Sequence, residues 1–225
     1  MAMFRRLVLI SALAGLCAGL AMSVVQAGRL WPLIAAAEML ESAPGGHDHE
    51  HEWSPHGALR MALTVLFNVA AGIGFALLLN AGVRLRGLWH HEVLSRQTGL
   101  LWGLAGFTAF ALAPSLGLPP ELPGMVSADL VSRQLWWVAT AACTMGALAL
   151  WAFQGGTWIL VAIVLAALPH LVGAPHGHGQ EHGAVPAELA AAFAAGSLAA
   201  SAIFWAVLGV VSGVAAERWD RASAA

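Results

Sequence analysis

Charged residues are scarce in this 225-residue chain, and their scarcity argues against a water-soluble protein. Only 10% of the residues are Asp, Glu, Lys or Arg, whereas about a quarter are charged in an ordinary soluble domain. At the same time 59% are hydrophobic, and the mean hydropathy is +0.75. A folded chain of this length could not hide so much apolar surface from water. The composition therefore predicts a protein whose solvent is the lipid bilayer.

Lysine is absent and cysteine is rare. All ten basic residues are arginine, and the formal net charge is only −2, so nothing in the charge balance indicates a nucleic-acid partner. Cys17 and Cys143 both lie in apolar stretches. Their spacing is not that of a redox pair or a thiolate metal site, so we interpret both as small packing residues.

Motifs of soluble catalysis are also missing. The sequence has no glycine-rich phosphate-binding loop and no HExxH pair, which excludes the usual motifs for ATP hydrolysis and zinc proteolysis. The apolar stretches carry no series of carboxylates that could relay protons across a membrane. We therefore predict that the protein is not an enzyme and needs no organic cofactor.

What the chain does have is long apolar stretches, of roughly the 20 residues that a membrane-spanning helix needs. Six such stretches cover residues 5–28, 59–81, 98–116, 131–153, 157–172 and 188–216. Three pairs of glycines stand four residues apart within them: Gly15 and Gly19, Gly99 and Gly103, and Gly209 and Gly213. Small residues at this interval let helices approach closely. We predict an all-α, polytopic integral membrane helix bundle of about six transmembrane helices, with residues 1–225 forming a single membrane domain.

Arginine placement predicts the orientation of these spans, because arginine is enriched on the cytoplasmic side. If six spans alternate, one side holds Arg5, Arg6, Arg84, Arg86, Arg96, Arg218 and Arg221. The other side holds only Arg29, Arg60 and Arg133. Both termini are therefore expected in the cytoplasm. Residues 1–27 also resemble a signal peptide, and their cleavage would leave five spans. The connection after residue 28 is expected to begin with an interfacial helix from Trp31 to Glu41.

Seven of the ten histidines lie in two connections that this orientation places outside the cell. The first connection, residues 42–57, alternates histidine with acid: His47, Asp48, His49, Glu50, His51 and Glu52, followed by His56. The second, residues 173–187, carries His176, His178, Glu181 and His182. Imidazole prefers late first-row metals, so these loops predict external capture of a divalent transition metal, with Co²⁺, Ni²⁺, Cu²⁺ and Zn²⁺ left open. His170, at the outer end of the fifth span, could receive ions from the second loop.

A proline-rich connection between the third and fourth spans carries further candidates. Glu121, Asp129, Arg133 and Gln134 either guide ions or form a structural clamp. Asp129 and Arg133 stand four residues apart and could pair on one helix face, and Glu121 could also return to Arg133. Trp136 and Trp137 are expected to be anchors at the membrane interface.

Several of these motifs together resemble the CbtA family, the proposed cobalt transporter subunits of bacteria. The resemblance is carried by Arg5-Arg6, the tract from His47 to Trp53, Gly57 with Arg60, Leu118–Met125 and Arg133–Trp137. It covers nearly the whole chain. It implies a multi-pass protein of the bacterial inner membrane, linked to cobalamin metabolism, and a small single-span partner, CbtB, that bears histidines.

These observations predict the membrane component of a cobalt uptake system. The external loops would capture Co²⁺ and pass it to the helix bundle. The alternatives are a nickel or zinc transporter subunit, or a membrane metal sensor that transports nothing. The lipid bilayer and the small subunit are the expected partners, and self-association into a homo-oligomer is left open.

Overall fold

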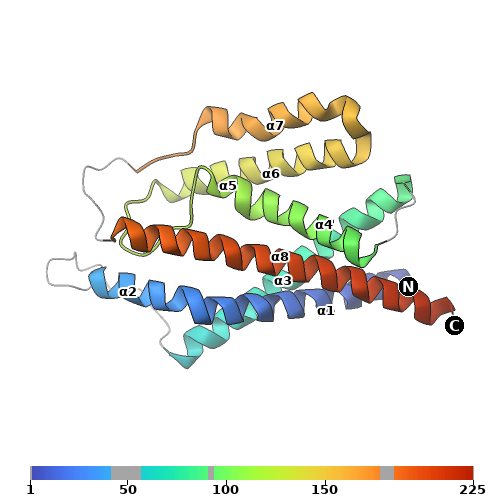
Figure 1. Ribbon diagram of the computed structural model, residues 1–225, viewed down its shortest axis with the longest axis horizontal. Coiled ribbons are helices and arrows are strands. Elements are labelled where there is room, and N and C mark those ends of the chain that lie inside the picture. The colour runs from blue at the N-terminus through green and yellow to red at the C-terminus, as the bar shows by residue number, and fades with distance from the viewer. Residues whose placement is uncertain (1, 42–56, 91–93, 178–184, 225) are drawn as a thin grey trace. The chain divides into compact units, whose positions relative to one another are not determined.

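The structure is a computed structural model that describes residues 2–41, 57–90, 94–177 and 185–224. Every regular element in these ranges is a helix (Figure 1). In chain order they are α1 (Ala2–Val25), η1 (Gln26–Leu30), α2 (Trp31–Glu41), α3 (Ala58–His90), α4 (Arg96–Phe107), η2 (Thr108–Leu112), α5 (Ala113–Ser115), α6 (Leu130–Gln154), η3 (Gly155–Trp158), α7 (Ile159–Val172) and α8 (Ala187–Ala224). The predicted all-α membrane fold is confirmed.

Five helical segments of the described chain are long and apolar enough to cross a membrane. They are Met3–Leu40, Ala58–Leu88, Arg96–Ser115, Leu130–Gln154 and Ala187–Ser223. The remaining predicted span, 157–172, is the shorter apolar helix Gly156–Val172. At 1.5 Å per residue this helix is about 25 Å long, a little less than the ~30 Å of a bilayer core.

Helix ends differ from the sequence prediction at three places. A helix with the predicted bounds, Trp31–Glu41, is present as α2, but it follows α1 and η1 without a break, so the three form one uninterrupted helical segment. The helix α3 continues to His90 and so includes Arg84 and Arg86, which were expected in a connection. Likewise α8 includes Arg218 and Arg221. Arginine can extend its charged end from a helix to the membrane interface, so its presence does not end an apolar helix.

Two π-helical segments precede prolines. The segment η1 ends at Leu30, two residues before Pro32, and η2 ends at Leu112, two residues before Pro114. Proline has no N–H to donate to the preceding turn. A local π-helical adjustment lets a membrane helix continue past such a position.

The chain forms two compact units. The first unit comprises Met1–Gln26, Asp48–Leu104 and Ala200–Ala225, and the second comprises Ala27–His47 and Ala105–Ala199. The first unit therefore contains α1, α3, most of α4 and most of α8. The second contains α2, the end of α4, the hairpin of α6 and α7, and the start of α8.

Glycines bring helix backbones into direct contact in the first unit. A side chain on Gly15 of α1 would meet the backbone of Gly72 and Ile73 in α3. Between α4 and α8 the contact is reciprocal: a Cβ on Gly99 would meet the carbonyl oxygen of Gly209, and a Cβ on Gly209 would meet that of Gly99. The predicted close approach is confirmed, and it joins two pairs of glycine-bearing helices.

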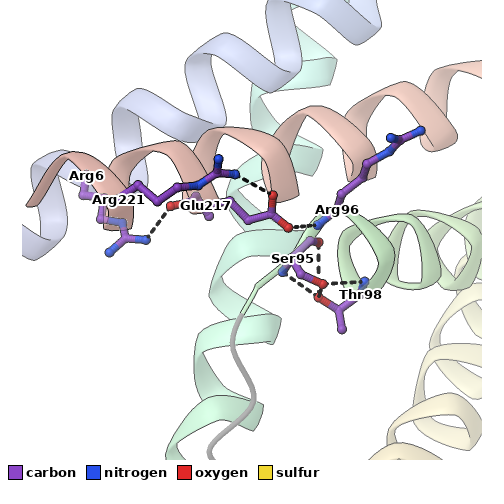
Figure 2. Close-up of polar contacts among 7 residues, drawn as sticks. Arg6, Ser95, Arg96, Thr98, Glu217 and Arg221 are labelled. Carbon is purple, nitrogen blue, oxygen red and sulfur yellow. Dashed lines mark hydrogen bonds and ion pairs between the residues drawn. The ribbon is translucent and has the colours of Figure 1, made fainter. Parts of the chain in front are cut away.

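Polar contacts join α1, α4 and α8 at one end of the first unit (Figure 2). Arg6 of α1 forms an ion pair of 2.5 Å with Asp220 of α8 and donates to the Ala216 carbonyl oxygen at 3.3 Å. The backbone N–H of Arg96, at the start of α4, donates to the Glu217 carboxylate at 2.8 Å. These contacts satisfy charged and backbone groups where the helices end.

Two further contacts fix the start of α4 and a turn of α8. The side chains of Ser95 and Thr98 cap α4 reciprocally, because each accepts the other's backbone N–H, at 2.8 and 3.2 Å. Arg221 pairs with Glu217, four residues earlier on α8, at 3.4 Å.

Candidate functional site

Most of the predicted metal ligands lie outside the described residues. This applies to His47, Asp48, His49, Glu50, His51, Glu52 and His56, and to His178, Glu181 and His182. The structure does describe His170 and His176. Within the described ranges no group of three or more His, Cys, Asp or Glu side chains gathers in a way that could hold a metal ion. The candidate site within the described residues therefore comprises the helix ends and the loop that lie beside His170 and His176.

The loop from Gly117 to Asp129 (the proline loop) contains a tight turn. The Met125 N–H donates to the Leu122 carbonyl oxygen at 3.3 Å, with Pro123 and Gly124 at the two central positions. Gly124 has φ of +78°, a conformation that this type of turn requires and that glycine adopts without strain. Leu122 is buried at 4% exposure, and its N–H donates to Met125 Sδ at 3.2 Å. The turn thus gives the proline loop a defined shape and an apolar anchor.

Glu121 ties the proline loop to the start of α6. Its Oε2 accepts from Arg133 at 2.6 Å and from the Ser127 hydroxyl at 2.6 Å. The Glu121 and Arg133 side chains are 17% and 29% exposed, so the pair is mostly shielded from solvent. The prediction that Glu121 returns to Arg133 is confirmed. Because the charges neutralise each other, this geometry favours the structural clamp over ion guidance.

Asp129 does not take Arg133 as its partner, as its spacing had suggested. It caps α6 instead: its Oδ2 accepts the Ser132 N–H at 3.0 Å and the Ser132 hydroxyl at 3.1 Å. These hydrogen bonds, the one from the backbone N–H first, lower the pKa of the Asp129 carboxyl below its usual value. A negative charge at this position also complements the positive end of the helix dipole. Gln134 is exposed on α6.

We expect Asp129→Ala to lower the melting temperature of the purified protein by a few degrees, because the α6 cap is lost. Asp129→Asn should retain much of the cap, because an amide oxygen also accepts the Ser132 N–H. The wild-type pKa is lowered on folding, so the charge contributes stability above the usual carboxyl pKa and this contribution is lost as the pH falls through the folded value. The wild type should therefore lose stability relative to Asp129→Asn below about pH 4. The melting temperatures of the wild type and both variants would be measured as a function of pH. If all three changed with pH in parallel, the cap would be ruled out.

Trp136 links α6 to the end of α7. Its indole N–H donates to the Pro169 carbonyl oxygen at 3.2 Å, and its ring meets His170 edge-on with centroids 5.6 Å apart. Trp136 is 8% exposed and also packs against Gly117. The prediction of an interfacial anchor is therefore wrong for Trp136, while Trp137 is 37% exposed. The indole needs a hydrogen-bond acceptor when it is buried, and the α7 backbone supplies one.

The α6–α7 hairpin returns the chain to the proline loop. Figure 1 shows α6 and α7 side by side, and the bond from Trp136 to Pro169 places the end of α7 near the start of α6. Gly173 caps the end of α7, and four residues later Gly177 lies against Val126 and Ser127 of the proline loop. His176 is exposed beside it, and His170 is half-buried. The start of the second histidine loop and the proline loop therefore share one end of the second unit.

Polar side chains inside the first unit bridge helices. The Asn80 amide of α3 donates to the Ala76 carbonyl oxygen at 2.9 Å, and it lies 3.0 Å from Ser11 Oγ of α1 and 3.3 Å from Ser212 Oγ of α8. Asn80 is 4% exposed, and both serines are fully buried. Neither serine was among the candidate residues that the sequence indicated. Small hydroxyl residues in apolar stretches were the available signal, because they commonly join membrane helices.

A second amide bridges α1 and α3. Asn68 donates to Ser23 Oγ at 3.0 Å and to Gln26 Oε1 at 2.6 Å. Asn68 and Gln26 lie in apolar stretches or at their ends, where a polar side chain can serve either helix packing or transport. Their direct bond shows that they serve packing in this arrangement.

Comparison with known proteins places the chain in one family. The family model described as "Probable cobalt transporter subunit (CbtA)" matches residues 4–217, which is nearly the whole chain. No curated protein and no solved structure matches it.

Proposed function

The chain belongs to the CbtA family of probable cobalt transporter subunits, and from this we propose that it captures Co²⁺ outside the bacterial inner membrane and passes it into its helix bundle. The termini lie in the cytoplasm, and both histidine loops lie outside. The first loop, residues 42–57, gathers the ion through alternating imidazole and carboxylate groups. These groups suit cobalt, nickel and zinc, and the family description favours cobalt among them.

One observation carries the proposal that the second loop takes part. The α6–α7 hairpin brings Gly177 against the proline loop, while His176 is exposed. The second histidine loop thus begins on a support that is held by the Glu121–Arg133 pair and the turn at Gly124. A loop anchored at this end keeps its histidines near one membrane face. His176, His178, Glu181 and His182 then form a second capture site.

His170 is the residue we assign to transfer from this loop toward the bundle. It is half-buried at the end of α7, its ring contacts the buried Trp136, and the exposed His176 follows six residues later in the chain. Its ring lies edge-on to the indole of Trp136, which fixes its orientation. A half-buried imidazole at a helix end can bind a metal without taking a charge into the hydrocarbon region.

The partner in this proposal is a small single-span subunit with histidines near one end. The family description as a subunit supports an assembly of more than one chain. In this proposal, uptake of Co²⁺ requires both chains of the assembly. Cobalt uptake into vesicles that contain the chain with and without the small subunit tests this division of labour. Equal uptake in both would contradict it.

Replacing His47, His49 and His51 with alanine should lower cobalt accumulation several-fold at limiting cobalt, because the loop loses half of its alternating ligands. Excess cobalt should restore accumulation, since capture then no longer limits uptake. Cells that express equal amounts of each variant would be assayed with radioactive cobalt, and nickel and zinc would serve as competitors. His90→Ala, which removes a histidine outside both loops, is the matched control. Unchanged accumulation at limiting cobalt would refute capture by the first loop.

The same vesicles distinguish transport from sensing. A sensor binds cobalt at the outer face without accumulating it inside, whereas a transporter fills the lumen. Accumulation that is competed more strongly by nickel or zinc than by unlabelled cobalt would reassign the cargo.

A further inference from the structure

A cavity of about 200 Å³ lies among α1, α3 and α8 in the first unit. Its wall carries the charged side chains of Arg6, Arg84 and Asp220, and it also includes Asn80 and apolar residues such as Leu7 and Leu94. Liquid water occupies about 30 Å³ per molecule, so the cavity has room for a tetrahedral oxyanion with a few waters. It lies in the end of the unit where α1 begins and α8 ends.

The two arginines of the cavity have different surroundings. Arg6 already pairs with Asp220 and donates to the Ala216 carbonyl oxygen, yet its Nε is buried without a hydrogen-bond partner. Arg84 is half-buried and forms no ion pair or hydrogen bond among the described residues. Two guanidinium groups and one carboxylate leave the cavity with one positive charge in excess. A half-buried cation without a partner, such as Arg84, is costly unless a ligand or solvent satisfies it.

The sign and shape of these groups select the ligand. Excess positive charge repels a divalent metal ion, so this cavity is not a passage for cobalt. Guanidinium groups match phosphate oxygens, because they can donate two parallel hydrogen bonds. Basic pockets between membrane helices are typical binding sites for anionic lipid headgroups. Leu7 and Leu94 on the same wall suit a phosphate that is attached to a lipid rather than one that is free in water.

We propose that this cavity binds the phosphate of an anionic phospholipid headgroup, held by Arg84, with Arg6 on the same wall adding positive charge. The bound lipid links α1, α3 and α8 at one membrane face. The site is separate from metal capture and is present whether or not the chain transports cobalt.

Native mass spectrometry of the full-length protein tests this with phosphatidylglycerol and phosphatidylcholine as probes. The wild type should retain phosphatidylglycerol preferentially and should melt at a higher temperature in its presence. Arg84→Gln should weaken phosphatidylglycerol retention by about five- to tenfold, because one guanidinium near a membrane surface contributes about that factor. Arg218→Gln is the matched control, because it removes an exposed arginine of α8 that does not line the cavity.

The outcomes separate the sources of phosphate. Equal retention by Arg84→Gln and the wild type would overturn the assignment. If Arg84→Gln does not fold, equal melting temperatures of the wild type in the two lipids would overturn it as well. Millimolar inorganic phosphate that displaces the lipid and stabilises the protein by itself would show that the cavity takes free phosphate instead. Loss of cobalt accumulation in the histidine variants would leave every one of these results unchanged.

Discussion

Replacing Gly209 with leucine is expected to separate α8 from α4 and to destabilise the protein by roughly 3 kcal/mol or more. The added Cβ would meet the Gly99 carbonyl oxygen and would stand 3.1 Å from the Gly103 Cα. Both neighbours are backbone atoms of a helix, so neither can move aside as a side chain could. In lipid, where no hydrophobic force drives helices together, such close packing is a main source of association. The melting temperature of the purified protein and the yield of monodisperse material would measure the effect.

Gly74→Leu is the matched control for this substitution. Gly74 also lies within a membrane-spanning helix, α3, but nothing stands within 4 Å of the position that its Cβ would take. The substitution should therefore leave stability almost unchanged. The reciprocal contact makes a second expectation: Gly99→Leu combined with Gly209→Leu should cost less than the sum of the two single substitutions, because either one already separates the helices. Additive losses, or an equal loss in Gly74→Leu, would contradict the packing assignment.

Breaking the pair of Glu121 and Arg133 is expected to have the second largest effect. Glu121→Gln would leave the Arg133 guanidinium, 29% exposed, without its carboxylate, and the buried Arg133 Nε already lacks a partner. Removal of one member of a buried pair costs several kcal/mol, but these side chains are partly solvated, so we expect about 1–3 kcal/mol. Arg133→Gln should have a similar effect. Gln134→Ala, which changes the exposed neighbouring residue, should have almost none.

A charge exchange distinguishes the structural clamp from ion guidance. The double variant Glu121→Arg with Arg133→Glu restores a pair of opposite charges, so it should recover part of the lost melting temperature. If the pair is structural, cobalt accumulation per folded molecule should recover with it. Recovery of stability without recovery of accumulation would instead assign an ion-guiding role to the carboxylate at position 121. Melting curves and uptake would be measured on the same preparations.

Much of the helical architecture could be predicted because the responsible forces act along the chain. An apolar stretch of about 20 residues has one favourable solvent and satisfies its own backbone hydrogen bonds as a helix. Helix ends were harder to predict. The helix α3 continues through Arg84 and Arg86, because a long side chain can keep its charge at the interface while the backbone stays helical. Likewise, a π-helical segment before Pro32 let a helix continue where a break was expected.

The candidate site could be predicted in its residue types but only partly in its contacts. Arg133 had two candidate partners at plausible spacing, and its partner is Glu121, twelve residues away across a turn. Helical spacing alone made Asp129 as plausible a partner of Arg133 as Glu121. The capping of α6 by Asp129 is also a local signal, since an acid just before a helix with a hydroxyl residue three positions later is typical of a cap. The burial of Trp136, by contrast, has no local signal. An aromatic residue near the end of a span is buried or interfacial depending on what packs over it.

The sequence by itself determined the solvent, the secondary structure and the chemistry that the two histidine loops can offer. Each depends on composition within a short stretch: hydropathy selects the bilayer, backbone hydrogen bonding selects the helix, and imidazole with carboxylate selects transition metals. The tertiary structure decided which glycine faces Gly209, which acid holds Arg133 and which hydroxyls meet Asn80. These partners come from segments far apart in the chain. They are selected by shape and distance between packed helices, which no local pattern of residues encodes.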